Sequence, residues 1–326
     1  MYRLSVSPHI HSKASVSRIM WTFIVALMPA MAASIWFFGP RALYLEIISV
    51  ATAVITELLT GLLLKKRITL SDGSAVITGL LVAFNMPVSV PYYVPIVGSF
   101  FGIAIVKQLF GGLGYNIFNP ALAARVFVMF AWLPEMTTWN APLTTSGFSK
   151  LAGFNFSIDT ITTATPLAIA KMKGMAGLLT EFGSKMGMYK DLFLGKCPGC
   201  IGETSALALL LGAGLLLLTK IIRWPIPLSY LATVVLICLL SGNDPIFHLL
   251  SGGLILGAFF MATDYVTSPM TPKGMILFGV GCGLVTMVLR LKGGLPEGVS
   301  FSILFMNALA PLIDRYFKNP VLGVKT

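Results

Sequence analysis

Long apolar runs recur along almost the whole 326-residue chain, and they constrain its fold more than any other feature. A helix that crosses a lipid bilayer needs roughly 20 mostly apolar residues. About ten runs approach that length, at 19–38, 43–64, 74–88, 92–110, 116–133, 203–219, 226–241, 247–262, 274–290 and 300–317. We therefore predict an all-α integral membrane protein with about ten transmembrane helices.

The composition excludes other classes of protein. Charged residues make up 11% of the chain and hydrophobic residues 56%, whereas soluble domains carry roughly twice that charged fraction. A soluble enzyme, a disordered chain and a disulfide scaffold are thereby excluded. The net charge of +11 fits the excess of Lys and Arg in cytoplasmic loops of membrane proteins. The expected surroundings are thus a lipid bilayer, with no nucleic acid partner.

One loop is long enough to fold by itself, and it divides the chain into residues 1–133, 134–202 and 203–326. The basic N-terminal segment and the apolar run after it have the shape of a signal peptide, with a weak cleavage pattern at Ala30-Met31-Ala32. The apolar run continues past that pattern to Phe38. We therefore favour an uncleaved first helix.

The charges of the short loops predict the orientation in the membrane. With the N-terminus in the cytoplasm, thirteen Lys and Arg residues face the cytoplasm, and only Arg41, Arg290 and Lys292 fall in short outer loops. This count places both termini in the cytoplasm and loop 134–202 outside the cell membrane.

Several landmarks of the first half recur about 182 residues later. They are Pro87 and Pro269, Gly98-x-x-x-Gly102 and Gly279-x-x-x-Gly283, Gly111-Gly112-Leu113 and Gly293-Gly294-Leu295, and Phe118 and Phe301. Each half would hold five helices, an odd number, so the two repeats must be inverted in the membrane. Inverted repeats place functional sites on short or Gly-interrupted helices, which fits the third run (Gly73, Gly79) and the eighth (Gly252, Gly253, Gly257). The alternative is ordinary helix packing through small residues.

The outer loop contains the segment Asp159-Thr160-Ile161-Thr162-Thr163-Ala164-Thr165-Pro166. Thr followed by Pro predicts a helix start, with Thr165 as the N-cap and Pro166 at the first helical position. The free N–H groups of such a start favour an anion, most naturally a phosphate. A plain helix cap is the alternative, and physical argument alone favours it.

The pattern Asp-x-x-Thr-Thr-Ala-Thr resembles the flavinylation motif Asp-x-x-Ser/Thr-Gly/Ser-Ala-Thr of respiratory flavoproteins. Other parts of the chain resemble the RnfD component of the Rnf complex, namely segments 71–74, 79–81, 111–122, 202–206, 263–269 and 297–301. The resemblance extends from about Ser7 to Tyr316. The chain is identified as a member of the RnfD/NqrB family, in which NqrB is the paralogue from the sodium-pumping NADH:quinone reductase. It departs from the motif at Thr163, where Gly or Ser is usual.

The resemblance implies an electron-transfer subunit of an ion-pumping (Na+ or H+) ferredoxin:NAD+ oxidoreductase in a bacterial or archaeal cytoplasmic membrane. It implies a fold related to that of urea channels and no complete activity for the chain alone. Thr165 would carry covalent FMN, with Asp159, Thr162 and Thr163 completing the motif. The expected partners are Rnf subunits A, B, C, E and G, of which G is the second subunit with covalent FMN.

The resemblance also implies a riboflavin near Asn116 and Asn119. Amides three residues apart share one helix face and can both donate and accept hydrogen bonds. Because Pro120 follows Asn119, a capped break in the helix is the alternative. Arg125, inside a span, should face a cavity or an anionic partner.

Acids at membrane depth are candidates for an ion pathway, and we select Glu57, Asp72 and Asp264. Glu57 is the leading candidate as a cation ligand because it lies mid-span with no partner evident in the sequence. Glu203 opens a span and Asp314 adjoins Arg315, so both have structural explanations.

Cys197-Pro198-Gly199-Cys200 cannot complete a zinc or iron–sulfur ligand set, and we predict no metal site. A disulfide or two unreactive thiols are favoured over an electron relay. The rival function for the whole chain is a passive channel or secondary transporter of the inverted-repeat type, and bound flavin would discriminate against it. A third possibility is a purely structural anchor for partner subunits.

Overall fold

The computed structural model describes residues 15–65, 70–142, 163–294 and 297–318, and every regular element in these ranges is a helix. The elements are α1 (Val16–Phe38), α2 (Pro40–Leu63), η1 (Leu70–Asp72), α3 (Ser74–Phe84), α4 (Tyr93–Phe100), η2 (Phe101–Gln108), α5 (Pro120–Ala131), α6 (Leu133–Met136), α8 (Pro166–Phe182), α9 (Lys185–Leu194), α10 (Ala206–Leu218), α11 (Pro225–Leu240), α12 (Pro245–Leu250), α13 (Leu254–Leu256), η3 (Gly257–Met261), α14 (Pro272–Lys292) and α15 (Val299–Tyr316). Of these, η1 is a 3₁₀-helix and η2 and η3 are π-helices.

Two sequence signals determine where most of these helices begin. Proline stands in the first turn of α2, α5, α8, α11, α12 and α14, where its missing N–H costs nothing. A Ser, Thr, Asp or Asn side chain accepts a hydrogen bond from the first turn of α1, α5, α8, α9, α10, α12 and α14.

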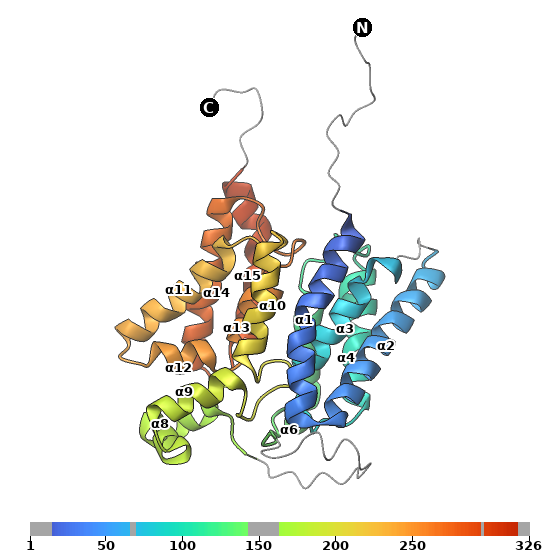
Figure 1. The fold of residues 1–326 in the computed structure, drawn as a ribbon. Coiled ribbons are helices and arrows are strands. Elements are labelled where there is room, and N and C mark those ends of the chain that lie inside the picture. Colours follow the sequence, from blue (N-terminus) through green and yellow to red (C-terminus); the bar gives the residue numbers. More distant parts are fainter. Residues whose placement is uncertain (1–14, 66–69, 143–162, 295–296, 319–326) are drawn as a thin grey trace.

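The helices form two groups that lie side by side (Figure 1). Helices α1 to α6 make up the first group and α10 to α15 the second, with contacts of α1 against α10 and of α5 against α15 between them. Helices α8 and α9 lie at one end of the molecule, and α9 contacts both α10 and α12. The first turn of α1 and the last turn of α15 lie at the opposite end.

Three of the described helices, α1, α2 and α14, are long and apolar enough to cross a membrane by themselves. Other apolar helices are shorter, and α3, with 11 residues, spans about 16 Å, roughly half of a bilayer core. Helices α5 and α10 are short as well. The apolar run 247–262 is divided between α12 and α13 at Gly252, whose φ is 66°. Apolar runs 74–88, 116–133, 203–219 and 247–262 therefore contain non-helical residues that hydropathy did not predict.

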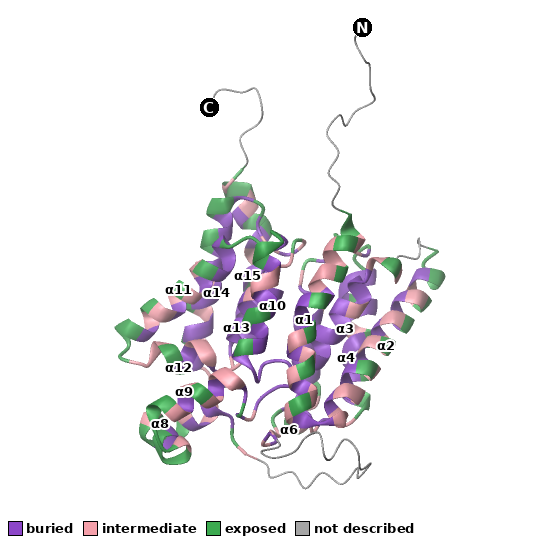
Figure 2. Ribbon diagram, in the orientation of Figure 1, coloured by how far each residue is buried: buried purple, intermediate pink, exposed green. Residues whose placement is uncertain are grey.

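Large apolar side chains cover the outer faces of the helices. Leu218 is 84% exposed and Leu240 79%, and exposed positions follow the outer sides of α1, α2, α11 and α14 in Figure 2. A soluble protein rarely exposes so much contiguous apolar surface. The surface therefore suits lipid, as the composition predicted.

The repeated glycines lie at close helix contacts. A Cβ on Gly102 would lie 2.9 Å from the Pro120 carbonyl oxygen of α5, whereas a Cβ on its counterpart Gly283 would lie 2.9 Å from the Tyr230 carbonyl oxygen of α11. Matching glycines in the two halves thus pack against non-matching helices. Close helix packing is therefore sufficient to explain these glycines, and the inverted repeat stays a prediction.

Candidate functional site

Thr165 begins α8, as the sequence predicted. Its side chain accepts a hydrogen bond from the Ala168 amide at 3.2 Å, and Pro166 follows at the first helical position. Only 4% of Thr165 is exposed. The amide of Thr163 donates to the Trp139 carbonyl oxygen, and the Thr163 hydroxyl is buried without a hydrogen-bond partner among the described residues. Asp159 and Thr162 of the motif lie outside the described residues.

A cavity of about 20 Å³ lies beneath this helix start. We call it the smaller cavity, and it is lined by Thr165, Pro166, Leu167, Leu192, Cys197, Pro198, Gly199, Glu203, Thr204, Leu250, Gly252 and Glu297. Its volume is enough for about one water molecule. The predicted attachment residue and two acidic side chains therefore share one small space.

The loop between α9 and α10 forms one wall of the smaller cavity and carries Cys197 and Cys200, which are buried free thiols. Burial, followed by the nearby Glu203 carboxylate, raises the pKa of Cys197 to about 12, so this thiol stays protonated and unreactive at neutral pH. The loop is fastened to the end of α3, because the amides of Ile201 and Gly202 donate to the carbonyl oxygens of Met86 and Phe84.

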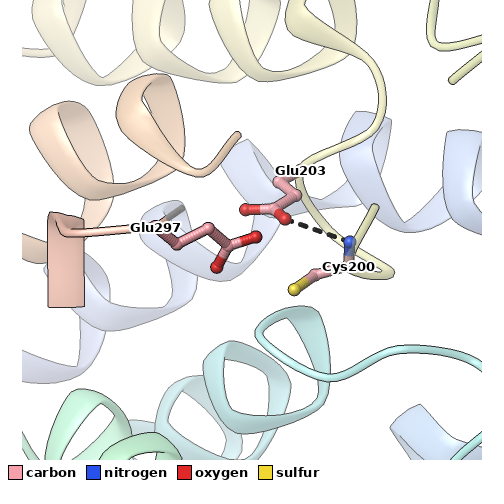
Figure 3. A group of neighbouring side chains, drawn as sticks. All are labelled: Cys200, Glu203 and Glu297. Atoms are coloured by element: carbon pink, nitrogen blue, oxygen red, sulfur yellow. Dashed lines mark hydrogen bonds between the residues drawn. The ribbon is translucent and has the colours of Figure 1, made fainter. Parts of the chain in front are cut away.

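A buried charged cluster lies where this loop meets α5 and the start of α15. We define it as Arg125, Cys200, Glu203 and Glu297, three of which are drawn in Figure 3. Arg125 forms an ion pair with Glu297 and donates to the Asn85 side-chain oxygen at 2.9 Å. Glu297 is therefore the anionic partner that Arg125 was expected to need.

A larger cavity of about 90 Å³ opens near the beginnings of α1, α3 and α5. It is lined by Ile19, Met20, Phe23, Ser74, Ile77, Thr78, Leu81, Lys107, Leu113, Asn116, Asn119, Pro120, Ala121, Ile221, Ile222, Phe260, Thr263, Asp264, Tyr265 and Val266. The walls are mainly apolar, and the rings of Phe23 and Phe260 meet edge to face within them. A concave apolar wall with a few polar groups is typical of a ligand site.

Asn116 and Asn119 both line the larger cavity, but they do not share a helix face as the sequence spacing suggested. Asn116 lies in the turn before α5, and its side-chain amide donates to the Phe118 carbonyl oxygen at 3.1 Å. Asn119 caps α5 through the amides of Ala121 and Leu122 and donates to the Met261 carbonyl oxygen. The prediction of one shared helix face was wrong because Pro120 starts a new helix.

Glu57 has a partner that the sequence did not reveal. Lys107, 50 positions away, forms an ion pair with it at 2.9 Å, and the two side chains are 2% and 3% exposed. The Lys107 ammonium group also donates to Ser74, and Gln108 donates to Glu57. This neutralisation removes the reason for choosing Glu57 as the leading cation ligand.

The other two acids chosen from the sequence have local hydrogen bonds. Asp72 accepts from the amide and hydroxyl of Ser74 at 2.8 and 2.6 Å at the start of α3. Asp264 accepts from Thr267 at 3.2 Å and lines the larger cavity. The structure therefore brings Asp264 together with Asn116 and Asn119, and leaves Asp72 outside the smaller and larger cavities.

Two of the basic residues that were counted to predict the orientation do not lie in loops, one on each predicted side of the membrane. Lys107 is not in a loop but buried beside Glu57, and Arg290 is buried near the end of α14, where it donates to the carbonyl oxygens of His248 and Ser251. Removing each from its side leaves twelve basic residues against two, so the predicted bias is unchanged.

Comparisons with known proteins match the chain to one family and to relatives of similar length. A family model described as the NQR2, RnfD, RnfE family matches residues 3–323. The D subunit of the Na(+)-translocating ferredoxin:NAD(+) oxidoreductase complex of Acetobacterium woodii is 52% identical over 324 residues, 98% of this chain and 95% of that protein. The D subunit of the Proton-translocating ferredoxin:NAD(+) oxidoreductase complex of Clostridium ljungdahlii is 46% identical over 332 residues, 100% and 97% of the two chains.

A more distant relative extends the comparison. The D subunit of the Ion-translocating oxidoreductase complex of Escherichia coli K12 is 36% identical over 351 residues, 99% of both chains. All three similarities therefore cover nearly the full length of both proteins.

Proposed function

The chain belongs to the NQR2, RnfD, RnfE family, and on that premise we propose that it is the membrane electron-transfer subunit of RnfD type in an ion-translocating ferredoxin:NAD+ oxidoreductase complex. The observation that carries the proposal is the full-length similarity to proteins named as the D subunits of such complexes. The named relatives differ in their ion, Na+ in one and a proton in the other. The proposal therefore includes either ion, and Rnf subunits A, B, C, E and G as partners.

In this proposal Thr165 carries FMN through a phosphoester bond. Two features support it: the motif that ends at Thr165, and the start of α8, whose free N–H groups favour a phosphate oxygen. An esterified Thr oxygen still accepts the hydrogen bond that it now receives from Ala168. The smaller cavity, at about 20 Å³, has no room for a flavin ring, so the ring must lie outside it. A flavin, when bound, supplies one- and two-electron transfer.

The burial of Thr165 sets an order of events within the proposal. A transferase cannot reach a hydroxyl that is 4% exposed. Attachment must therefore precede the docking of the preceding segment, in which the Thr163 amide bonds to Trp139.

The proposal places riboflavin against the larger cavity, between apolar walls and a polar side that includes Asn116, Asn119 and Asp264. Asn119 holds the start of α5 and the end of η3, so its task there is to fix the shape of the cavity. The volume of about 90 Å³ is below that of pockets for drug-sized ligands. Side chains at the edge of the cavity must therefore move to admit the ring.

The covalent flavin is tested by intact-mass measurement on the chain purified from a host that makes the flavin transferase. Wild type and Thr165→Ser should gain the mass of FMN less one water, and the denatured band should fluoresce. Thr165→Ala should show neither signal. Thr163→Ala is the matched control, because it removes a neighbouring hydroxyl and should keep the added mass. An unmodified wild-type chain would make Thr165 a plain helix cap and would favour the channel alternative.

The proposal extends to the membrane arrangement, with ten spans in two inverted five-helix repeats, 1–133 and 203–326, and both termini in the cytoplasm. It is supported by the position of the first turn of α1 and the last turn of α15 at the end opposite α8 and α9 (Figure 1). Labelling of single introduced cysteines tests it, since all four native thiols are buried. An impermeant maleimide should reach Lys173→Cys from outside the cell and Lys318→Cys only after the membrane is opened.

A further inference from the structure

The charged cluster contains one more negative charge than positive charge. Glu203 is 6% exposed and Arg125 4%, and Glu297 is paired with Arg125. An isolated buried charge is strongly disfavoured unless it is paired and hydrogen-bonded. One carboxylate of the two therefore needs a cation or a proton that the ion pair does not provide.

The unbalanced negative charge is assigned to the Glu203 side chain by its hydrogen bonds. Its Oε1 accepts from the Cys200 amide at 3.0 Å, but its Oε2 is buried and has no hydrogen-bond partner within the described ranges. Figure 3 shows this second oxygen on the side toward the Glu297 carboxylate. Ligand atoms of Cys200, Glu203 and Glu297 all lie within 4.8 Å of one another. Two carboxylates at this separation cannot both remain ionised without cost.

The other charged and titratable neighbours among the described residues do not provide this partner. Arg125 is directed to Glu297, Asn85 and the Cys200 sulfur. Arg290, from α14, lies close enough to Glu203 and Glu297 to interact with them electrostatically. It makes no hydrogen bond to either carboxylate within the described ranges, because its amino groups are held by two carbonyl oxygens at the C-terminal end of α12, where the helix dipole is negative. The Cys197 thiol lines the smaller cavity and stays neutral.

We propose that Glu203 and Glu297 bind one proton between them, held on Glu203 Oε2 and donated to the Glu297 carboxylate. Protonation forms one O–H bond on Glu203 and one hydrogen bond between the two side chains, and no electron is transferred. The arrangement gives the buried oxygen a partner and makes the cluster neutral. This inference goes beyond the proposed flavin function and does not depend on it.

The donor set favours a proton over a metal ion. Hard cations in proteins usually collect six or more oxygen ligands, whereas the third donor atom here is a thiol sulfur. That thiol donates to the Asn85 carbonyl oxygen at 3.5 Å and faces the Arg125 guanidinium group. A positive neighbour and a neutral sulfur both weaken the binding of a hard cation.

The smaller cavity provides the route by which this proton exchanges. Glu203, Glu297 and Thr165 all line it, and its volume admits about one water molecule. A water there would connect the carboxylate pair with the start of α8. The proton of the pair thus exchanges toward the end of the molecule that carries α8 and α9.

Infrared difference spectroscopy on the complex isolated from its membrane tests the proposal. The carbonyl band of a protonated carboxyl group should be present in wild type at neutral pH and should be lost on raising the pH. Glu203→Gln and Glu297→Gln should each lack that band and take up one proton fewer per chain over the same titration. Glu57→Gln is the matched control, because Glu57 is a buried carboxylate already neutralised by Lys107, and it should keep the band.

The Gln variants preserve the shape of the side chain, and the amide of Glu203→Gln donates to Glu297 as the protonated acid would. Normal assembly of this variant with loss of the band is the expected result. An unchanged band in both Gln variants would overturn the proposal. Loss of the band when Na+ replaces choline at constant pH would also overturn it, because a metal ion would then be the ligand.

Discussion

Arg125 of α5 and Glu297, which precedes α15, form a largely buried ion pair across 172 positions of sequence. The pair joins the two groups of helices close to the end of α3, whose C-cap residue Asn85 also accepts a hydrogen bond from Arg125. The Arg125 side chain is 5% exposed and that of Glu297 13%, so Arg125 in particular depends on its partner.

We expect Glu297→Ala to lower the free energy of unfolding by about 3–5 kcal/mol, because buried Arg125 would lose the carboxylate with which it forms its direct ion pair. The double variant Arg125→Met with Glu297→Leu should recover most of that loss, since two apolar side chains leave no charge uncompensated. Denaturant titration of the purified chain in detergent measures both. Equal destabilisation in the single and double variants would contradict the assignment.

Two glycines of α10 provide a matched test of the contact between the halves. A Cβ on Gly212 would lie 2.0 Å from the Ala26 carbonyl oxygen of α1, whereas a Cβ on Gly214 would meet nothing within 4 Å among the described residues. Gly212→Ala should therefore force α1 and α10 apart and lower the melting temperature. Gly214→Ala should be neutral or stabilise by up to about 1 kcal/mol. The idea fails if both variants melt alike.

The cap of α8 is tested separately from the flavin. In a host without the transferase, Thr165→Ala should remove the acceptor for the Ala168 amide and destabilise the helix start by about 1 kcal/mol. Hydrogen exchange of that first turn should accelerate about fivefold, while Thr165→Ser should exchange as wild type. No change in exchange for Thr165→Ala would show that the hydroxyl does not cap the helix.

Asp244, at the start of α12, should make the stability of the folded protein dependent on pH in the acid range. Burial raises its pKa, but the hydrogen bonds from Tyr189 and Lys185 and the amide of Phe247 outweigh burial and leave the pKa below its ordinary value. A carboxyl group with a lowered folded pKa stabilises the fold above its unfolded pKa, and this contribution is lost as the pH falls through the folded pKa.

Wild type should therefore melt at a higher temperature than Asp244→Asn, with the largest difference near neutral pH. This difference should become smaller below a pH of about 4. Tyr189→Phe removes one hydrogen bond to the carboxylate and should move that loss to a higher pH. A difference that stays constant down to strongly acidic pH would refute the ionised Asp244 cap.

Local signals in the sequence predicted local structure well. The length and hydropathy of the apolar runs predicted α1, α2 and α14, and the adjacent Thr165 and Pro166 predicted the start of α8. These features depend on neighbouring residues alone. The same is true of Asn119 as a cap, which the sequence offered only as an alternative to a shared amide face with Asn116.

Partners distant in sequence could not be predicted from one chain. Glu57 and Lys107 lie on different helices 50 positions apart, and nothing in either run indicates that their faces meet. Glu297 could not be predicted as the partner of Arg125, because the sequence does not show that α15 packs against α5. Glu203 was set aside as the opening of a span, because its unpartnered oxygen is visible only in three dimensions.

The hydrogen bonds from Ile201 and Gly202 to the end of α3 have a consequence for how the protein is made. Those two carbonyl groups belong to the first half, yet their donors are translated only after nearly all of loop 134–202. Until then the membrane-inserted first half holds unsatisfied backbone oxygens at an interrupted helix, a state that lipid penalises. A nascent chain that stops before residue 200 should therefore be a substrate for membrane quality-control proteases, and one that extends beyond residue 205 should resist them.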